Sequence, residues 1–85
     1  MKTVEIYTTQ ACPYCIAAKR LLNNKGANFT EIDVGRDSYL REVMTKRAKG
    51  SRTVPQIFIG GTHVGGCDDL HALDDDGELD ALLAG

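Results

Sequence analysis

Two cysteines separated by two residues, Cys12 and Cys15, are the part of this 85-residue sequence best suited to chemistry. Proteins use a Cys-x-x-Cys pair as half of a zinc site, as a structural disulfide or as a redox-active dithiol. A closed zinc site needs four ligands, and the remaining candidates are Cys67, His63 and His71, without a second Cys-x-x-Cys. Three cysteines are an odd number, which argues against a disulfide framework. A redox-active dithiol is therefore the preferred interpretation, with zinc and a structural disulfide as the alternatives.

The residues around the pair predict how a helix would hold it. Pro13 suits the first position of a helix, where a missing backbone N–H costs nothing, and this makes Cys12 the N-cap residue. The free N–H groups of Tyr14 and Cys15 then point back toward the Cys12 sulfur, and the helix dipole acts with them to favour the reactive thiolate. Cys15 follows one turn later on the apolar face, close enough to form a disulfide. We therefore expect Cys12 to attack and Cys15 to resolve the mixed disulfide.

The hydrophobic pattern predicts the elements that must position this turn. In chain order they are a strand over 3–8, a helix over 13–25, a strand over 28–34, a helix over 38–50, a hairpin over 55–66 and a helical segment over 70–83. Gly26 is a C-terminal cap, Gly60-Gly61 is a tight hairpin turn, and Gly77 breaks the last segment. Because a strand–helix–strand unit has parallel strands and a hairpin adds antiparallel ones, we expect one α/β domain over residues 1–85. It would hold a four-stranded mixed sheet with helices on both faces.

The bulk composition is that of an ordinary small globular domain, with 42% hydrophobic residues, 26% charged residues and a net charge of −2. This charge balance gives no reason to expect a nucleic-acid or membrane partner. The first ten residues lack the apolar segment of a secretory signal, and no stretch approaches the ~18 apolar residues of a membrane span. We therefore expect a cytoplasmic location, where paired cysteines tend to be catalytic or metal-bound.

Three blocks of the sequence resemble the glutaredoxin family, in particular its dithiol members of the bacterial glutaredoxin 3 type. They are CPYC over 12–15, TVPQIFI over 53–59 and GGCDDL over 65–70, and the similarity runs from Val4 to Leu83. The resemblance implies a thioredoxin fold and a glutathione-dependent oxidoreductase with a redox-active Cys12–Cys15 pair. Glutathione would be the reducing co-substrate, and no metal is expected.

The TVP block is assigned to glutathione binding by this resemblance, together with Tyr14. Thr53 would line the site, and the family implies a cis bond between Val54 and Pro55. Such a bond would leave the Val54 backbone free to pair with the extended glutathione peptide, as in β-strand addition. The alternative is that Pro55 is simply the residue that starts a strand.

The GGCDD block is assigned to glutathione by the same resemblance. Gly66 allows close approach of the backbone, and the N–H groups of Cys67 and Asp68 at a helix start suit the γ-glutamyl carboxylate. Asp69 or Asp68 would meet the ammonium group. The alternatives are that the aspartates only favour the helix start, and that Cys67 is a third redox thiol.

One departure from the family concerns charge. Glutaredoxins usually carry a Lys a few residues before the first active-site Cys, but here Thr9 stands at that position with Gln10 beside it. We therefore expect weaker affinity for glutathione. Arg52 is the candidate for an alternative partner of the glycyl carboxylate, because it directly precedes Thr53.

Two rival functions remain open. A redoxin reduced by thioredoxin reductase would ignore glutathione, which the GGCDD block argues against. A carrier of a glutathione-ligated [2Fe–2S] cluster would use the first cysteine, which the stiff turn at Pro13 disfavours. The expected partners are glutathione and proteins that carry a disulfide or a glutathionyl group, with ribonucleotide reductase among the candidates, and we expect a monomer.

Overall fold

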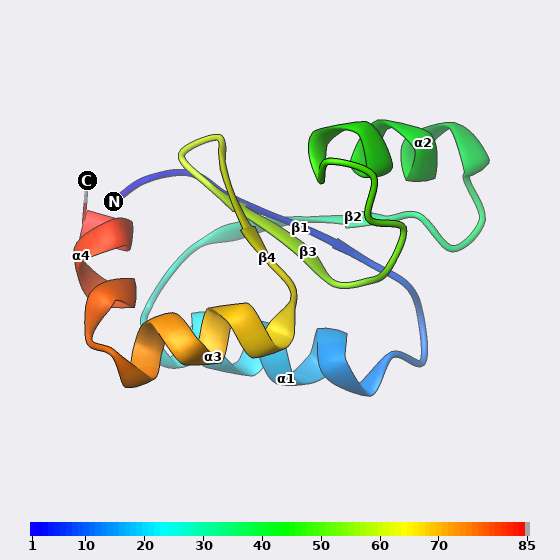
Figure 1. The fold of residues 1–85 in the computed structure, drawn as a ribbon. Helices are drawn as coiled ribbons and strands as arrows, with labels where there is room; N and C mark the ends of the chain where they lie inside the picture. The colour runs from blue at the N-terminus through cyan, green and yellow to red at the C-terminus, as the bar shows by residue number, and fades with distance from the viewer. Residues whose placement is uncertain (85) are drawn as a thin grey trace.

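The computed structural model of the protein describes residues 1–84, in which four strands form a single mixed sheet (Figure 1). The strands are β1 (Val4–Thr8), β2 (Phe29–Asp33), β3 (Gln56–Ile59) and β4 (Thr62–Gly65). Their order across the sheet is β2-β1-β3-β4, with β1 parallel to β2 and antiparallel to β3, and β3 antiparallel to β4. The predicted parallel pair and the predicted hairpin are both confirmed.

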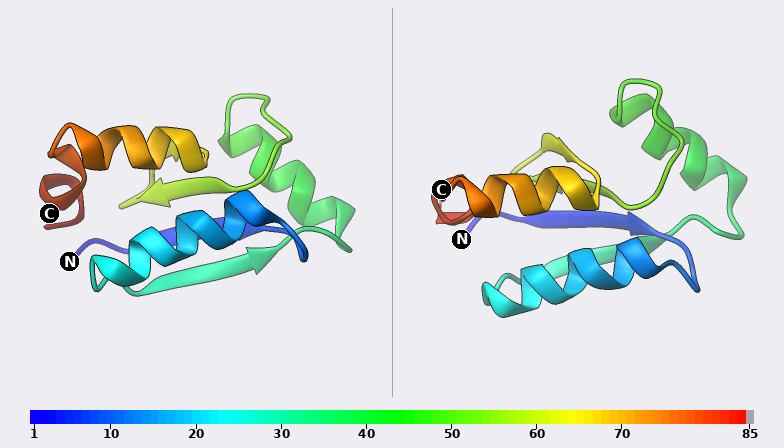
Figure 2. Two further views of the ribbon diagram at one scale, coloured as in Figure 1. Left: turned by 90° about the horizontal axis from the view of Figure 1, so that it is seen from below. Right: turned by 60° about the horizontal axis from the view of Figure 1, so that its bottom comes forward.

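The helices cover both faces of this sheet, as predicted. They are α1 (Pro13–Asn24), α2 (Ser38–Arg47), α3 (Cys67–Asp75) and α4 (Glu78–Ala84). Helices α1 and α3 lie together on one face, while α2 lies on the other (Figures 1 and 2). Within residues 1–84, no helix combines the length and the apolar character that crossing a bilayer requires.

The ends of the helices follow local chain chemistry. The Asp37 side chain accepts a hydrogen bond from the Leu40 N–H at 3.0 Å and so begins α2. That helix ends at Arg47, three residues before the predicted end, since Lys49 and Gly50 have positive φ values of 58° and 98°. Gly77, with φ of 75°, separates α3 from α4 as predicted.

Two apolar clusters hold the layers together, one on each face of the sheet. The larger cluster joins the sheet to α1, α3 and α4 through Ile6, Ala18, Leu22, Ile57, Ile59, Leu70 and Leu79, among others. The smaller one joins the sheet to α2 through Tyr7, Met44, Ala48 and Phe58, together with Val34. Successive residues of β1 and β3 alternate between the clusters, as side chains on a strand must. The central strands thereby fix the starts of α1 and α3 at one end of the sheet (Figure 2).

Arg47 falls at the helical spacing of the core residues of α2, but it makes its contacts through a charged guanidinium group. Its guanidinium pairs with Glu5 at 2.9 Å and donates to the Tyr7 hydroxyl at 2.8 Å. It also lies 4.1 Å from the centroid of the Phe58 ring, a cation–π contact. The bond to Glu5 is the main reason why the pKa of Arg47 is raised. Arg47 thus ties α2 to the sheet by charge as well as by apolar contact.

Candidate active site

The turn that carries both cysteines joins β1 to α1. Ala11, just before Cys12, has a φ of 55°, an uncommon conformation for a residue with a side chain. Cys12 is the N-cap residue and Pro13 occupies the first helical position, as predicted. The N–H of Cys15 donates to the Cys12 Sγ at 3.1 Å. The Cys12 side chain thereby caps the helix through its sulfur.

The two thiols differ sharply in their surroundings. Cys12 is half-buried and can be reached from solvent, whereas Cys15 is only 1% exposed. Burial, assisted by the neighbouring Cys12 side chain, raises the pKa of the Cys15 thiol to about 12. Cys15 therefore remains protonated at neutral pH, which agrees with Cys12 as the attacking group and Cys15 as a shielded partner.

Alkylation of the reduced protein should reveal this difference. Raising the pKa of Cys15 from 9.0 to about 12 lowers its thiolate fraction at pH 7.5 about a thousandfold, so iodoacetamide should modify Cys12 first. The alkylation rate at Cys15 should still increase with pH above pH 9, where the rate for a thiol of ordinary pKa reaches its plateau. Peptide mass spectrometry of a Cys67→Ser protein between pH 6 and 10 measures both rates. Equal rates at pH 7.5 in the folded protein would contradict the assignment.

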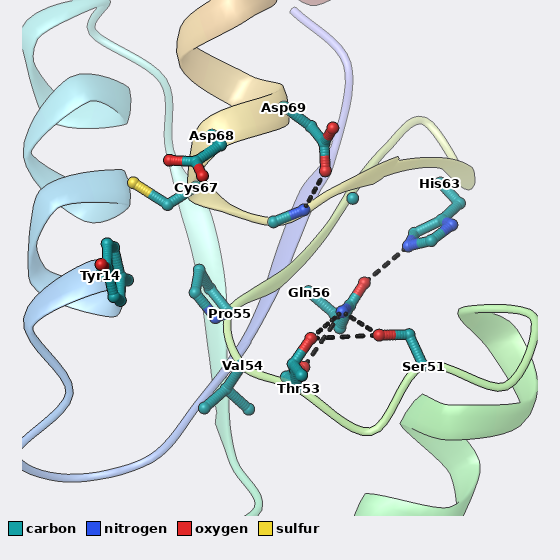
Figure 3. Close-up of a pocket in the computed structure, with 12 residues that line it drawn as sticks. Tyr14, Ser51, Thr53, Val54, Pro55, Gln56, His63, Cys67, Asp68 and Asp69 are labelled. Atoms are coloured by element: carbon teal, nitrogen blue, oxygen red, sulfur yellow. Dashed lines mark hydrogen bonds between the residues drawn. The ribbon is translucent and has the colours of Figure 1, made fainter.

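A hollow of about 380 Å³ lies between the starts of α1 and α3 (Figure 3). Three separate segments line it, namely Tyr14 of α1, the residues around Pro55 before β3, and the junction of β4 with α3. The structure brings these predicted site residues together around it: Tyr14, Thr53, Val54, Pro55, Gly66, Cys67, Asp68 and Asp69. Gly65, the first residue of the predicted GGCDD block, also lines it, together with three residues that were not predicted for the glutathione site, Ser51, Gln56 and His63.

Tyr14 and Pro55 stand on facing sides of the hollow in Figure 3. Helical spacing puts Tyr14 on the same side of α1 as the apolar residues, but its side chain is 64% exposed. It belongs to the first turn of the helix, where a side chain can project beyond the packed layers. The Val54–Pro55 bond is cis, as the family resemblance implied.

The start of α3 is held by Asp69. Its carboxylate accepts a hydrogen bond from the Gly66 N–H at 2.9 Å, which caps the helix. Gly65 has a φ of 117°, and a Cβ there would collide with the Asp69 carboxylate, so this position requires glycine. Asp69 therefore has the helix-start role that was given above as the alternative. The exposed Asp68 carboxylate does not cap the helix.

Cys67 lines the hollow but is only 7% exposed. Burial chiefly, and then the charges of Asp68 and Cys12, raise the pKa of the Cys67 thiol. Its sulfur lies 3.4 Å from the Nδ1 of His71, and that Nδ1–H donates to the Cys67 carbonyl at 2.9 Å. A protonated, buried thiol fits a backbone role better than a redox role. In the part of the chain that the structure describes, no three His, Cys, Asp or Glu side chains are grouped to hold a metal ion.

A second hollow, of about 280 Å³, lies where the family Lys would be. Thr9 and Gln10 line it together with two arginines, Arg36 and Arg41. The Arg41 guanidinium donates to the Arg52 carbonyl at 2.9 Å. The exposed Arg52 side chain is not part of the lining of either hollow. The cations beside Thr9 therefore come from α2 and the loop before it, which the sequence alone did not indicate.

Comparison with known proteins agrees with this geometry. The family model described as Glutaredoxin matches residues 4–64. The chain is 60% identical over 84 residues to the Glutaredoxin of Pseudomonas aeruginosa, with 99% of each chain covered. It is 55% identical over 83 residues to Glutaredoxin 3 of Escherichia coli K12, covering 98% of this chain and 99% of the relative.

Among solved structures, the crystal structure of a buckwheat glutaredoxin–glutathione complex superposes with a TM-score of 0.89 at 30% identity, covering 98% of this chain and 77% of that one. The mixed sheet with helices on both faces is accordingly the thioredoxin fold that was expected. The chain belongs to the glutaredoxin family of thiol–disulfide oxidoreductases.

Proposed function

We propose that the protein is a glutathione-dependent dithiol oxidoreductase, which reduces protein disulfides and glutathione mixed disulfides. The observation that carries this proposal is the reachable Cys12 sulfur, which accepts the Cys15 N–H at 3.1 Å. It lies at the start of α1, two residues before Tyr14, which lines the hollow. A nucleophilic sulfur beside a peptide-sized hollow suits thiol–disulfide exchange with a small peptide.

With a glutathione mixed disulfide, the Cys12 thiolate attacks the glutathione sulfur. The bond between that sulfur and the substrate breaks, and the substrate leaves as a thiolate that takes up a proton. A second glutathione thiolate then attacks the Cys12-bound sulfur and leaves as oxidised glutathione. This restores Cys12 and needs no contribution from Cys15.

With a protein disulfide, Cys12 attacks one sulfur and the other leaves as a thiolate. Cys15 then loses its proton and attacks the Cys12 sulfur, which releases the second substrate thiolate and forms the Cys12–Cys15 disulfide. Two glutathione molecules reduce that disulfide in turn. Substrates would be proteins that carry a disulfide or a glutathionyl group. A reducing compartment such as the cytoplasm suits this chemistry.

The lining residues suggest how glutathione would lie. Its peptide part would run along the Val54 backbone, and its γ-glutamyl carboxylate would meet the free N–H groups of Cys67 and Asp68 at the start of α3. Because Asp69 already caps Gly66, the exposed Asp68 carboxylate is the better partner for the ammonium group. The solved glutathione complex of the buckwheat relative supports this use of the fold.

The glycyl carboxylate requires a cation, and Arg52 remains our candidate together with Arg36 and Arg41 of the second hollow. Thr9→Lys adds the missing charge directly. It should lower the KM for glutathione about two- to fivefold, the effect of a solvent-exposed ion pair of roughly 0.4–1 kcal/mol. Steady-state kinetics at low and high salt test this, with Thr9→Gln as the uncharged control. An unchanged KM at low ionic strength would count against it.

A pair of coupled assays tests the proposed function itself. One supplies glutathione and glutathione reductase, and the other supplies thioredoxin reductase, with a glutathionylated peptide and a protein disulfide as substrates. We expect turnover only with glutathione. Turnover with thioredoxin reductase alone would favour the redoxin alternative. Visible absorbance after anaerobic reconstitution with iron and sulfide would favour the cluster carrier.

A further inference from the structure

We propose that Gln56 and His63 are positioning residues, which hold the segment Ser51–Pro55 in the shape that binds the peptide part of the substrate. The binding role of that segment rests on the proposed function. Its structural role does not, and the two can be tested separately. Neither side chain was predicted as part of the glutathione site, although both line the larger hollow.

The side-chain amide of Gln56 holds the shape of the segment through hydrogen bonds to two of its residues. It is the first residue of β3 and is only 3% exposed. The Nε2 group donates to the Thr53 carbonyl at 3.0 Å, to the Ser51 Oγ at 3.0 Å and to the Thr53 Oγ1 at 3.2 Å (Figure 3). An amide has two hydrogens for these three acceptors, so one hydrogen is shared. These bonds reach across Val54 and Pro55, the two residues proposed to meet the ligand.

His63 determines which way the Gln56 amide faces. Its Nε2 lies 2.7 Å from the Gln56 Oε1, and an amide oxygen can only accept, so Nε2 must carry the hydrogen. With this oxygen bound to His63, the amide nitrogen faces the Thr53 carbonyl. A flipped amide would place two acceptors face to face at Thr53 and lose the bonds of the segment. His63 therefore selects the one orientation that holds Ser51 and Thr53.

The imidazole is itself fixed by the smaller core cluster. His63 is opposite Phe58 in the register of β3 and β4, and the two rings stack with centroids 4.9 Å apart. Phe58 is 2% exposed, lies under the Arg47 guanidinium and meets the Tyr7 ring edge-on at 5.8 Å. Val54 packs against the same cluster. The shape of the segment thus depends on packing between α2 and the sheet.

The Cys12 turn takes no part in these contacts, because it belongs to α1 on the opposite face of the sheet. Losing the Gln56 amide should therefore weaken substrate binding without changing the thiol. Gln56→Met keeps the length of the side chain and removes its donors. It should raise the KM for a glutathionylated peptide about tenfold, the effect of two lost neutral hydrogen bonds, with kcat within about twofold. The alkylation rate of Cys12 should stay as in the wild type.

Two comparisons separate positioning from stability. Ile59→Val removes one core methylene at the far end of β3 and should lower stability while leaving the KM unchanged. The double variant Gln56→Met/His63→Phe removes both partners of the Gln56–His63 hydrogen bond, so neither is left unpaired, and it keeps a ring against Phe58. If positioning is the role, its KM stays raised even when stability returns. A KM that recovers with stability would overturn the proposal.

Amide hydrogen exchange of the protein without ligand supplies a readout that does not depend on activity. In Gln56→Met, the amide of Ser51, which donates to the Ala48 carbonyl at 3.2 Å, should exchange faster, and those of the Cys12–Cys15 turn should not. This result would support the structural role even if the wild type showed no glutathione turnover. Absence of turnover would contradict only the proposed function. Unchanged exchange in the segment would overturn the structural role. Faster exchange with an unchanged KM would overturn the binding role.

Discussion

Replacing Cys12 by serine should reduce glutathione-coupled activity to the rate without enzyme, on protein disulfides and on glutathione mixed disulfides alike. A serine hydroxyl is not ionised at neutral pH and cannot form the disulfide intermediate on which both routes depend. The hydroxyl still fits the N-cap position, where serine is favoured, so the fold should be retained. Consumption of NADPH by glutathione reductase measures the loss, and circular dichroism checks the fold.

Residual activity in Cys12→Ser would have to come from one of the two remaining thiols, of which Cys67 lines the hollow. A double variant, Cys12→Ser with Cys67→Ser, identifies it. Activity that survives the first change and disappears with the second would contradict Cys12 as the nucleophile. We expect no such activity, because burial and the Asp68 carboxylate keep the Cys67 thiol protonated by raising its pKa.

Replacing Cys15 by serine should separate the two proposed reactions. Reduction of glutathione mixed disulfides should continue, since only Cys12 and a second glutathione take part. Reduction of protein disulfides should fall roughly tenfold or more, because an intramolecular resolving step is replaced by attack from free glutathione. The ratio of the two rates, measured in one coupled assay, is the informative quantity.

Cys15→Ala is the matched control for this change, because Cys15 is 1% exposed and serine would bury a hydroxyl there. Both variants should show the same change in the ratio of rates, even if their stabilities differ. Equal losses on both substrates would mean that Cys15 supports the structure of the turn and does not resolve disulfides.

Much of the fold could be predicted from the sequence because its signals are local. Pro13 marks the start of α1, Gly60 and Gly61 form the hairpin turn with φ values of 58° and 82°, and Gly77 ends α3. The end of α2 was placed too late because Lys49 is left-handed, a conformation that side-chain chemistry does not favour for lysine. That conformation is set by the surrounding chain and is not visible in the helical pattern.

The site was predictable only in part, for reasons of distance along the chain. Cys12 and Cys15 are one helical turn apart, so their asymmetry follows from spacing and capping alone. Apart from Tyr14, the lining of the hollow comes from residues within 51–56 and 63–69, far from that turn along the chain, and only the family resemblance brought the predicted ones together. Gln56 and His63 meet through the register of β3 with β4, which periodicity does not fix. A polar Gln56 inside the apolar run after Pro55 was the available signal.

The most direct measurement is the intact mass of the Cys15→Ser protein after mixing with a glutathionylated peptide. Without the resolving thiol, the first intermediate should accumulate as one glutathione attached to the enzyme, and peptide mapping should place it on Cys12. Treatment with free glutathione should then remove it. A protein that stays unmodified, or one that carries the group on Cys67, would contradict glutathione exchange at Cys12.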